Sequence, residues 1–315
     1  MSRVLITGTS GFVGSNIKIT SAKKVVRAVN SNVENTNVSN HTHFISSLDS
    51  KTNWNNAFHN ITSIIHLAGL AHNHDYTVED YKSVNVQGTL HLATEATKAG
   101  VKRFVFVSSI GVNGTVTHNS VFTPGQVACP HNAYAQSKYD AEVGLKKIAA
   151  ETGLEVVIVR PTLVYGPNAP GNFGALTKLV KKVPFLPFGL ANNKRDFIAV
   201  QNLADLLIAC SEHPNAPGHT FLASDGETVS IKEFTNAIAE GQGKKLIQLP
   251  LPISMMKFAA KLLGKSAMAV QLLDDLQVDT SNAYDILGWK APYTMKQAMS
   301  LLSDQDSTTN QSDNK

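Results

Sequence analysis

A glycine-rich turn placed directly after a short apolar run constrains the fold of this chain more than any other feature. The run, 4–7, suits a short buried strand, and Gly8, Gly11 and Gly14 follow it. Glycines in such a turn allow a tight bend, a close approach of the backbone to a pyrophosphate, and close packing of the next helix. The helix N-terminus then offers free N–H groups to phosphates. The spacing is Gly-x-x-Gly-x-x-Gly, and its place between a strand and a helix favours dinucleotide binding over an ordinary turn.

Expected strands and helices alternate from this turn as far as Gly166. The expected elements are strands 25–29, 62–67, 103–108 and 156–160, and helices 85–99 and 133–152, ended by Gly100 and Gly153. This alternation predicts an α/β protein with a doubly wound, Rossmann-like parallel sheet. We expect a dinucleotide-binding domain and a smaller, mostly C-terminal substrate-binding domain. The expected ranges are 1–166 with part of 197–228 for the first, 167–196 and 229–302 for the second, and 303–315 for a disordered tail.

The composition excludes several classes of protein. The chain has 315 residues, of which 43% are hydrophobic and 17% charged, as in a globular protein with a sizeable core. The net charge of +4 comes with no basic stripe, so we expect no nucleic-acid partner. No apolar run is long enough to span a membrane, so we expect no membrane partner. Cys129 and Cys210 lack metal-ligand spacing, which predicts no metal site and a reducing, cytoplasmic location.

The residues after the second expected strand leave the choice of dinucleotide open. An Asp or Glu roughly 20 residues beyond the glycine turn would bind the adenosine ribose of NAD. Here the strand ends at Val29-Asn30-Ser31, and no acidic residue precedes Glu34. The absence permits NADP, but no arginine follows the strand to bind a 2′-phosphate. We assign Asn30 to the cofactor site and expect NAD, with NADP as the alternative.

A tyrosine, a lysine and a serine form a candidate catalytic group. Tyr134 and Lys138 are four residues apart on an expected helix and therefore share a face. A free tyrosine has a pKa of about 10, and a nearby ammonium group favours the phenolate that a general base needs. Ser109 follows an expected strand at the sheet edge where ligands bind, so it could hold a substrate hydroxyl while Tyr134 moves the proton. The alternative is a surface pair on an amphipathic helix and a plain strand end.

A series of ordered motifs resembles one known family. The motifs are Thr7-Gly8-x-x-Gly11-Phe12-x-Gly14, His66-Leu67-Ala68-Gly69, Asn85-Val86-x-Gly88-Thr89, Ser108-Ser109, Tyr134-x-x-x-Lys138, Arg160-Pro161-Thr162-x-x-Tyr165-Gly166-Pro167, Arg195-Asp196-Phe197 and Leu287-Gly288-Trp289. With them the chain resembles, over nearly its whole length, the extended short-chain dehydrogenase/reductases, also called the NAD-dependent epimerase/dehydratase family. The resemblance implies that Ser109, Tyr134 and Lys138 are catalytic.

The resemblance also implies two sets of binding residues. It assigns to the dinucleotide Gly8, Gly11, Phe12, Val13, Ser47, Leu48, Leu67, Ala68, Gly69, Asn85, Tyr134, Lys138 and Pro161. It assigns to the sugar nucleotide Ser109, Asn172, Phe173, Leu186, Phe188 and Arg195, with Arg195 on the diphosphate and Leu186 to Phe188 at the uracil. His72 follows the nicotinamide-side strand and could contact the substrate.

Departures from the family pattern narrow the expected reaction. Ile110 and Gly111 stand where four-six dehydratases of the family carry an Asp-Glu pair, so dehydration is not expected. The run 108–114 is similar to a bacterial surface-polysaccharide subgroup labelled as UDP-sugar 4-epimerases, which also contains 4-ketoreductases for UDP-2-acetamido-2,6-dideoxy-hexulose. We therefore expect a 4-epimerase of the UDP-glucose or UDP-N-acetylglucosamine type.

Two alternatives stay open beside the epimerase. The first is a 4-ketoreductase for a UDP-4-keto-6-deoxy-N-acetylhexosamine, favoured by Asn30 and by the lack of a second diphosphate arginine in 272–278. The second is a non-catalytic dinucleotide-sensing protein, which ranks lower because Ser109, Tyr134 and Lys138 are all present. The family often dimerises, so a homodimer is compatible with the resemblance.

Overall fold

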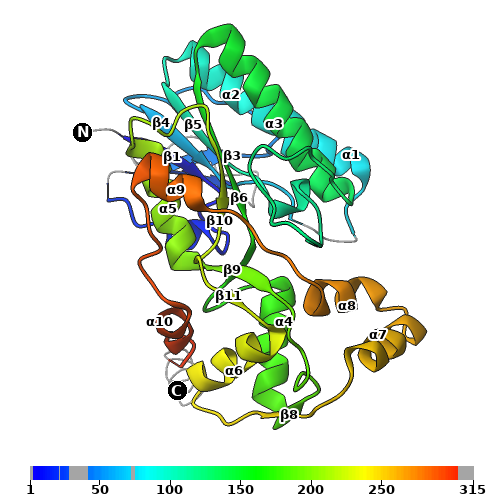
Figure 1. Ribbon diagram of the computed structural model, residues 1–315. Helices are drawn as coiled ribbons and strands as arrows, with labels where there is room; N and C mark the ends of the chain where they lie inside the picture. The colour runs from blue at the N-terminus through cyan, green and yellow to red at the C-terminus, as the bar shows by residue number, and fades with distance from the viewer. Residues whose placement is uncertain (1–2, 21, 28–41, 72–74, 304–315) are drawn as a thin grey trace, which may run out of the picture.

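A parallel sheet forms the centre of the larger part of the molecule (Figure 1). The computed structural model describes residues 3–20, 22–27, 42–71 and 75–303. Within these ranges the main sheet has seven strands in the order β10-β6-β5-β4-β1-β2-β3, and every pairing is parallel. The strands are β1 Val4–Thr7, β2 Lys23–Arg27, β3 Thr42–Ile45, β4 Ser63–His66, β5 Arg103–Val107, β6 Glu155–Pro161 and β10 Thr220–Ala223. The predicted Rossmann-like fold is confirmed, and the strand order reverses between β1 and β4, where such sheets bind ligands.

Helices cover both faces of this sheet because its strands are apolar on both sides. Phe104 and Phe106 of β5 pack toward α2 (Thr89–Lys98) and α3 (Ala133–Thr152). Val105 and Val107 of the same strand pack in the opposite core with α5 (Val200–Glu212) and α9 (Ser281–Leu287). Figure 1 shows these two helix layers on either side of the strands.

Local capping explains the position of α3, which carries the predicted catalytic pair. The side chain of Asn132 accepts a hydrogen bond from the backbone N–H of Ala135 at 2.8 Å and so caps the first turn. Gly153 ends the helix in the left-handed conformation, with φ at 77°. The predicted range 133–152 is therefore confirmed, and Tyr134 lies in the first turn of the helix.

Two expected helices differ from the structure. The turn at Gly14 opens only a short 3-10 helix, η1 (Gly14–Asn16), instead of an α-helix. The connection to β2 is short and contains Ile17, Ile19 and Thr20, whose β-branched side chains disfavour helix. The expected helix 85–99 begins earlier: α1 (Val78–Tyr81) leads into a π-helical stretch, η2 (Lys82–Gly88), which continues as α2.

The smaller part of the molecule surrounds a second hydrophobic core. Its elements are β7 Leu163–Tyr165, α4 Gly171–Lys182, β8 Phe185–Leu186, β9 Arg195–Ala199, β11 Thr228–Val229, α6 Ile231–Gly241, β12 Ile247–Gln248, α7 Ile253–Leu262, α8 Ser266–Leu273 and α10 Met295–Ser300. Aromatic rings of Tyr165, Phe173, Phe197 and Phe234 stack and cross in this core. The boundaries of the two parts stay a prediction, and α9, in the range expected for the smaller part, packs on the main sheet.

The described residues contain no helix that is long and apolar enough to cross a bilayer. Over the same residues, no group of three or more His, Cys, Asp or Glu side chains is arranged to hold a metal ion. Of the expected tail 303–315, only Ser303 lies within the described residues.

Candidate active site

The glycine turn lies at the carboxyl end of β1, at the strand-order reversal. Gly8 has a positive φ of 74°, and a Cβ there would lie 2.8 Å from the backbone nitrogen of Ala68. A Cβ on Gly14 would lie only 2.2 Å from the carbonyl oxygen of Gly8. The backbone N–H of Gly11 donates to that same oxygen at 3.0 Å. The turn is therefore so tightly packed that side chains at Gly8 and Gly14 would displace the backbone.

The buried His66 connects the end of β1, before the glycine turn, to β4, the neighbouring strand in the sheet. The Thr7 hydroxyl accepts hydrogen bonds from the backbone N–H groups of Leu67 and Ala68, at 3.2 and 3.1 Å, so its single proton is donated to His66 Nδ1 at 2.7 Å. The opposite ring nitrogen, Nε2, then carries the proton and donates to Thr89 Oγ1 at 2.9 Å. Burial, with a smaller effect from the nearby Lys138, lowers the pKa of His66 to about 3, which keeps the ring neutral.

Asn85 fixes the loop after β4 against α3. Its Oδ1 accepts from the backbone N–H of Leu70 at 2.7 Å, and its Nδ2 donates to the Leu70 carbonyl and to Ser137 Oγ, both at 3.0 Å. The residue is buried within the π-helical stretch, a conformation that often occurs at functional sites. A Cβ on Gly69 would lie 2.8 Å from Asn85 Oδ1 and 3.6 Å from Lys138 Nζ, so the loop runs close to both side chains.

The three predicted catalytic residues lie together at the end of β5 and the start of α3. Ser109 and Tyr134 are joined by a side-chain hydrogen bond. Burial raises the pKa of Tyr134 to about 12, while the bond to Ser109 lowers it and Tyr81 raises it further. Lys138 Nζ donates to the carbonyl of Val107 at 3.0 Å. Burial lowers its pKa to about 8, opposed by the carboxylate of Glu142, so the group is mostly an ammonium ion at neutral pH.

A buried ion pair connects β6 to α3, the helix that carries Tyr134 and Lys138. Arg160 on β6 donates from Nε and Nη2 to the two carboxylate oxygens of Glu142 on α3, at 2.8 and 2.5 Å. The two side chains are 4% and 1% exposed. Ser108 donates to the same carboxylate at 2.5 Å, and Arg160 Nη1 donates to Asn113 Oδ1 at 2.9 Å. The network thus links the strand that ends at the catalytic serine to the helix that carries Lys138.

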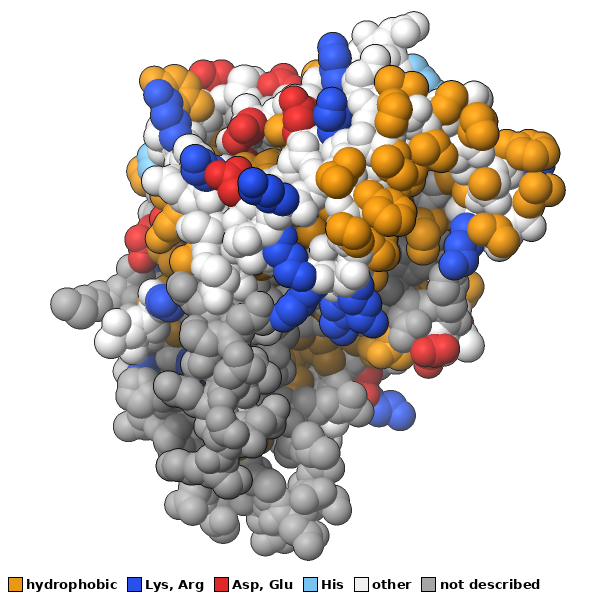
Figure 2. Space-filling model, turned by 90° about the horizontal axis from the view of Figure 1, so that it is seen from below, with side chains coloured by type: hydrophobic (Ala, Val, Ile, Leu, Met, Phe, Trp, Pro, Cys, Tyr) orange, Lys and Arg blue, Asp and Glu red, His pale blue; other side chains and the backbone are white. Residues whose placement is uncertain are grey.

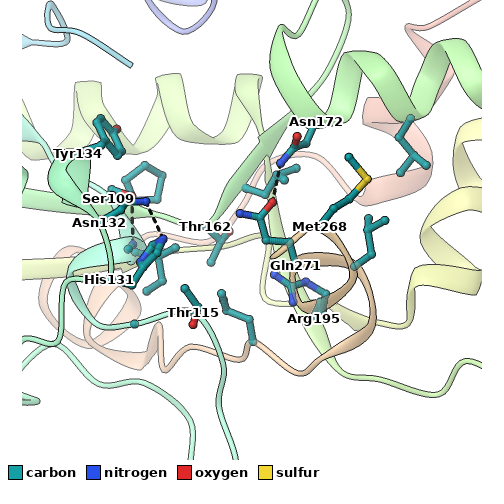
Figure 3. Close-up of a pocket in the computed structure, with 18 of the residues that line it drawn as sticks. Ser109, Thr115, His131, Asn132, Tyr134, Thr162, Asn172, Arg195, Met268 and Gln271 are labelled. Atoms are coloured by element: carbon teal, nitrogen blue, oxygen red, sulfur yellow. Dashed lines mark hydrogen bonds between the residues drawn. The ribbon is translucent and has the colours of Figure 1, made fainter. Parts of the chain in front are cut away.

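A cavity of about 340 Å³ adjoins the catalytic residues. Figure 3 shows Ser109 and Tyr134 on one side of it and Asn172, Met268 and Arg195 on the other. The lining also includes Gly111, Gly114, Thr115, His131, Asn132, Pro161, Thr162, Leu163, Leu176, Leu179, Gln271, Leu272 and Leu276. The cavity is therefore lined by residues from both parts of the chain, as a substrate site would be.

Besides Ser109, two polar side chains from the predicted substrate set line this cavity. Asn172 Nδ2 donates to Gln271 Oε1 at 2.8 Å, which connects α4 to α8 across the cavity wall. Arg195 Nη1 donates to the carbonyl of Asp274 at 2.6 Å. Burial lowers the pKa of Arg195 to about 10, opposed by Asp274 and two further carboxylates, so it stays a cation at neutral pH.

Other predicted site residues lie elsewhere. Phe173, Leu186 and Phe188 are buried in the second hydrophobic core and do not line the cavity. Ser47 and Leu48 follow β3, and the backbone of Leu48 passes close to Gly88: a Cβ on Gly88 would lie 3.0 Å from the carbonyl group of Leu48. Phe12 packs against the second core, and Val13 and Leu67 pack against the first. Asn30 and His72 lie outside the described residues.

Several residues that position the site were not predicted from the sequence. Glu142 carried no recognisable motif, since a lone glutamate on a helix is normally a surface residue. Arg160, His66 and Thr89 belonged to matched motifs, but a motif does not reveal which buried polar partner each side chain meets. Ser137 and Gln271 gave no signal in the sequence.

A parallel sheet with a tight glycine turn at its strand-order reversal, and a Ser-Tyr-Lys group beside a cavity, defines a dinucleotide-binding enzyme of the short-chain dehydrogenase/reductase class. Residues 4–224 match the NAD dependent epimerase/dehydratase family, and the chain belongs to it. A UDP-glucose 4-epimerase of Vibrio cholerae is 39% identical over 302 residues, covering 93% of this chain and 92% of the relative.

Two more distant proteins extend the comparison. An Escherichia coli O157:H7 protein, an N-acetyl-alpha-D-glucosaminyl-diphospho-ditrans,octacis-undecaprenol 4-epimerase, is 27% identical and matches 70% of each chain. The crystal structure of the Thermotoga maritima UDP-glucose 4-epimerase with UDP-glucose superimposes with a TM-score of 0.72 at 21% identity, covering 98% of this chain and 99% of that one. The last comparison supports the fold.

Proposed function

We propose that the protein is an NAD-dependent UDP-sugar 4-epimerase for substrates of the UDP-glucose or UDP-N-acetylglucosamine type. The observation that carries the proposal is the group of Ser109, Tyr134 and the buried Lys138, with Ser109 and Tyr134 at the wall of the cavity. The 4-epimerase relative that matches 93% of the chain supports the reaction type. The intact catalytic group argues against a protein that only senses a dinucleotide.

The glycine turn and its surroundings fit a nicotinamide dinucleotide. Gly8, Gly11 and Gly14 leave the backbone of the turn uncovered at three positions, and Gly69 carries no side chain where the loop passes Asn85 and the Lys138 ammonium group. When bound, NAD would accept a hydride from the sugar C4 and return it. The turn, from Gly8 to Val13, would hold the pyrophosphate, while Lys138 would bind the nicotinamide ribose. Because no acidic residue stands between the end of β2 and Glu34 to select the ribose, NADP stays the alternative.

Tyr134 would move the proton of the C4 hydroxyl. A phenol with a pKa of about 12 cannot act as a base near neutral pH without help. Lys138 supplies a buried positive charge on the same helix face, and Ser109 donates or accepts a hydrogen bond as the charge changes. Ser109 would also hold the C4 oxygen. After the 4-keto sugar has rotated in the cavity to present its opposite face, Tyr134 would return the proton.

Arg195 and Asn172 would hold the far end of the substrate. The guanidinium of Arg195 is a buried cation suited to the diphosphate, and Asn172 offers hydrogen bonds beside it. The side chains of Leu186 and Phe188 are packed in the core, so any contact that they make with uracil would come from their backbone.

One observation favours the 4-ketoreductase as a second candidate. The segment 272–278 passes the cavity through Leu272 and Leu276, and it supplies no second cation for the diphosphate. A reductase would use the same three catalytic residues but would exchange its dinucleotide at each turnover. A 4-epimerase regenerates its dinucleotide and retains it.

Location and assembly belong to the same proposal. The described chain has two free cysteines, the exposed Cys129 and the buried Cys210, which suits a reducing compartment such as the cytoplasm. A UDP-sugar would be the small-molecule partner. A homodimer stays a prediction, which light scattering on the purified protein would check.

The proposal is tested by assaying UDP-glucose and UDP-N-acetylglucosamine for conversion to their C4 epimers with no added dinucleotide. Tyr134→Phe removes the proton carrier and is expected to lower kcat by about 10²–10⁴-fold. Tyr139→Phe, the same change five residues along on the same helix, is the matched control and keeps the wild-type rate. Equal rates in both variants, or no conversion by the wild type, would contradict the epimerase.

A further inference from the structure

The helix pair α7–α8 exposes large apolar side chains. Met255, Phe258, Leu262 and Leu263 are 59%, 64%, 73% and 72% exposed, and Met268 is 49% exposed. We call these five residues the α7–α8 face. Figure 2 shows hydrophobic side chains gathered on the right of the molecule, the side on which Figure 1 places α7 and α8. An exposed apolar group of this size indicates an interaction surface.

The exposure follows from the sequence of α7, which is apolar on two sides. Ile253, Met256 and Ala260 pack against the second hydrophobic core and hold the helix on the molecule. Met255, Phe258 and Leu262 follow the same helical spacing on the outside, and no residue of α7 is buried. A helix with apolar residues all round normally lies in a core or against another apolar phase.

The face is continuous with the mouth of the cavity. Met268 belongs to the face and also lines the cavity. Leu179, on the facing helix α4, also lines the cavity and is 43% exposed. A surface that covered the α7–α8 face would therefore lie beside the entrance to the candidate active site.

The charged residues within the segment that carries the face all have one sign. No Asp or Glu occurs between Glu240 and Asp274, whereas the segment contains Lys244, Lys245, Lys257, Lys261 and Lys265. Lys257 pairs with Asp274. Lys261 and Lys265 flank the two most exposed leucines of the face. Helices with an exposed apolar side and lysines at its border lie at bilayer interfaces, and the lysines attract anionic headgroups.

We propose that the α7–α8 face docks on an anionic lipid surface and places the mouth of the cavity at the bilayer interface. The sequence predicted no membrane partner because no segment is long enough to span a bilayer, whereas a helix that lies on the surface needs only one exposed apolar side. Docking of this kind is independent of the reaction at C4, so it stands even where the proposed function fails.

The test is flotation of the full-length protein with vesicles of phosphatidylcholine, with and without phosphatidylglycerol. The wild type is expected to float with the anionic vesicles and to be released by high salt. The double variant Phe258→Ser/Leu262→Ser is expected to lose at least tenfold in vesicle affinity. Val78→Ser/Val127→Ser, which changes two valines that are 68% and 86% exposed elsewhere, is the matched control and floats as the wild type does.

A second test separates the charges from the apolar side chains. Lys261→Gln/Lys265→Gln is expected to weaken binding to anionic vesicles by about fivefold per lysine, with little effect on neutral vesicles. Circular dichroism and thermal unfolding show whether each variant is folded. The proposal is overturned by absence of flotation, or by equal flotation of the wild type and the Phe258 and Leu262 variant. It is also overturned if the α7–α8 face is a homodimer interface. The wild type would then be a dimer that does not bind vesicles, and only the Phe258 and Leu262 variant would dissociate into monomers.

Discussion

The buried ion pair between Arg160 and Glu142 offers a prediction of stability that can be worked from the structure. Arg160→Met removes three hydrogen bonds and leaves the Glu142 carboxylate buried with Ser108 as its remaining donor. Breaking a buried pair by removing one partner costs about 3–5 kcal/mol of the free energy of unfolding. With about 2.1 cal/mol/K of unfolding entropy per residue, a loss of about 4 kcal/mol lowers the Tm of this chain by roughly 6 °C.

Two further variants isolate the reason for that loss. Glu151→Gln removes the exposed pair with Lys147 on the same helix, and this matched control is expected to cost less than about 1 kcal/mol. Joint replacement, Arg160→Met with Glu142→Leu, removes both charges and is expected to recover at least half of the loss from Arg160→Met alone. Recovery would show that the cost comes from the unpaired buried carboxylate and not from a lost contact alone.

The assay is thermal and urea unfolding, followed by circular dichroism, of five proteins: the wild type, Arg160→Met, Glu142→Leu, the double variant with both changes, and Glu151→Gln. A drop in Tm of less than about 1 °C for Arg160→Met would refute the reasoning, since the carboxylate would then be solvated or protonated at little cost. A double variant that loses the sum of the two single changes would also refute it, because the two side chains would not be coupled.

Two further predictions concern the residues around the glycine turn. The pKa of His66 is lowered from its unfolded value of about 6.5 to about 3, so the unfolded chain binds the extra proton and stability is lost as pH falls through this window. His66→Gln is expected to reduce the slope of unfolding free energy against pH by up to about 1.4 kcal/mol per pH unit, and an unchanged slope in urea titrations would mean that the ring is charged in the folded state. Gly14→Ala would bring a Cβ to 2.2 Å from the Gly8 carbonyl oxygen, so we expect calorimetry to show a loss of NAD affinity of at least tenfold. Gly125→Ala, with open space around it, is the control and keeps full affinity.

Most of the central fold could be predicted because its signals are local. The apolar runs of the parallel strands, the glycine turn after β1, and the asparagine and glycine that bound α3 each follow from short-range rules. The short 3-10 helix after the glycine turn could not be predicted correctly. The few residues between the turn and β2 exclude a longer helix only once both strands have their places in the sheet. The hydrogen bond from Asn85, in the π-helical stretch, to Ser137 on α3 likewise appears only in the tertiary structure.

The candidate site was predictable where one motif places several groups on one element. Tyr134 and Lys138 share a helix face, so their proximity follows from spacing alone. Phe173, Leu186 and Phe188 were expected at the substrate, but their side chains fill the core of the smaller part. The family resemblance that places an apolar residue near a site does not say whether its side chain points into the site or away from it. The partnership of Glu142 with Arg160 joins a helix to a strand and needs the tertiary structure.

The central claim is that the Ser109, Tyr134 and Lys138 group works on a dinucleotide that the protein retains and regenerates. The most direct measurement is to denature the purified protein and to identify and quantify any released dinucleotide by mass spectrometry. We expect NAD⁺ at nearly one molecule per chain. A protein that is purified empty and binds NADH or NADPH reversibly would support the 4-ketoreductase instead, and a protein with no affinity for any nicotinamide dinucleotide would contradict the account.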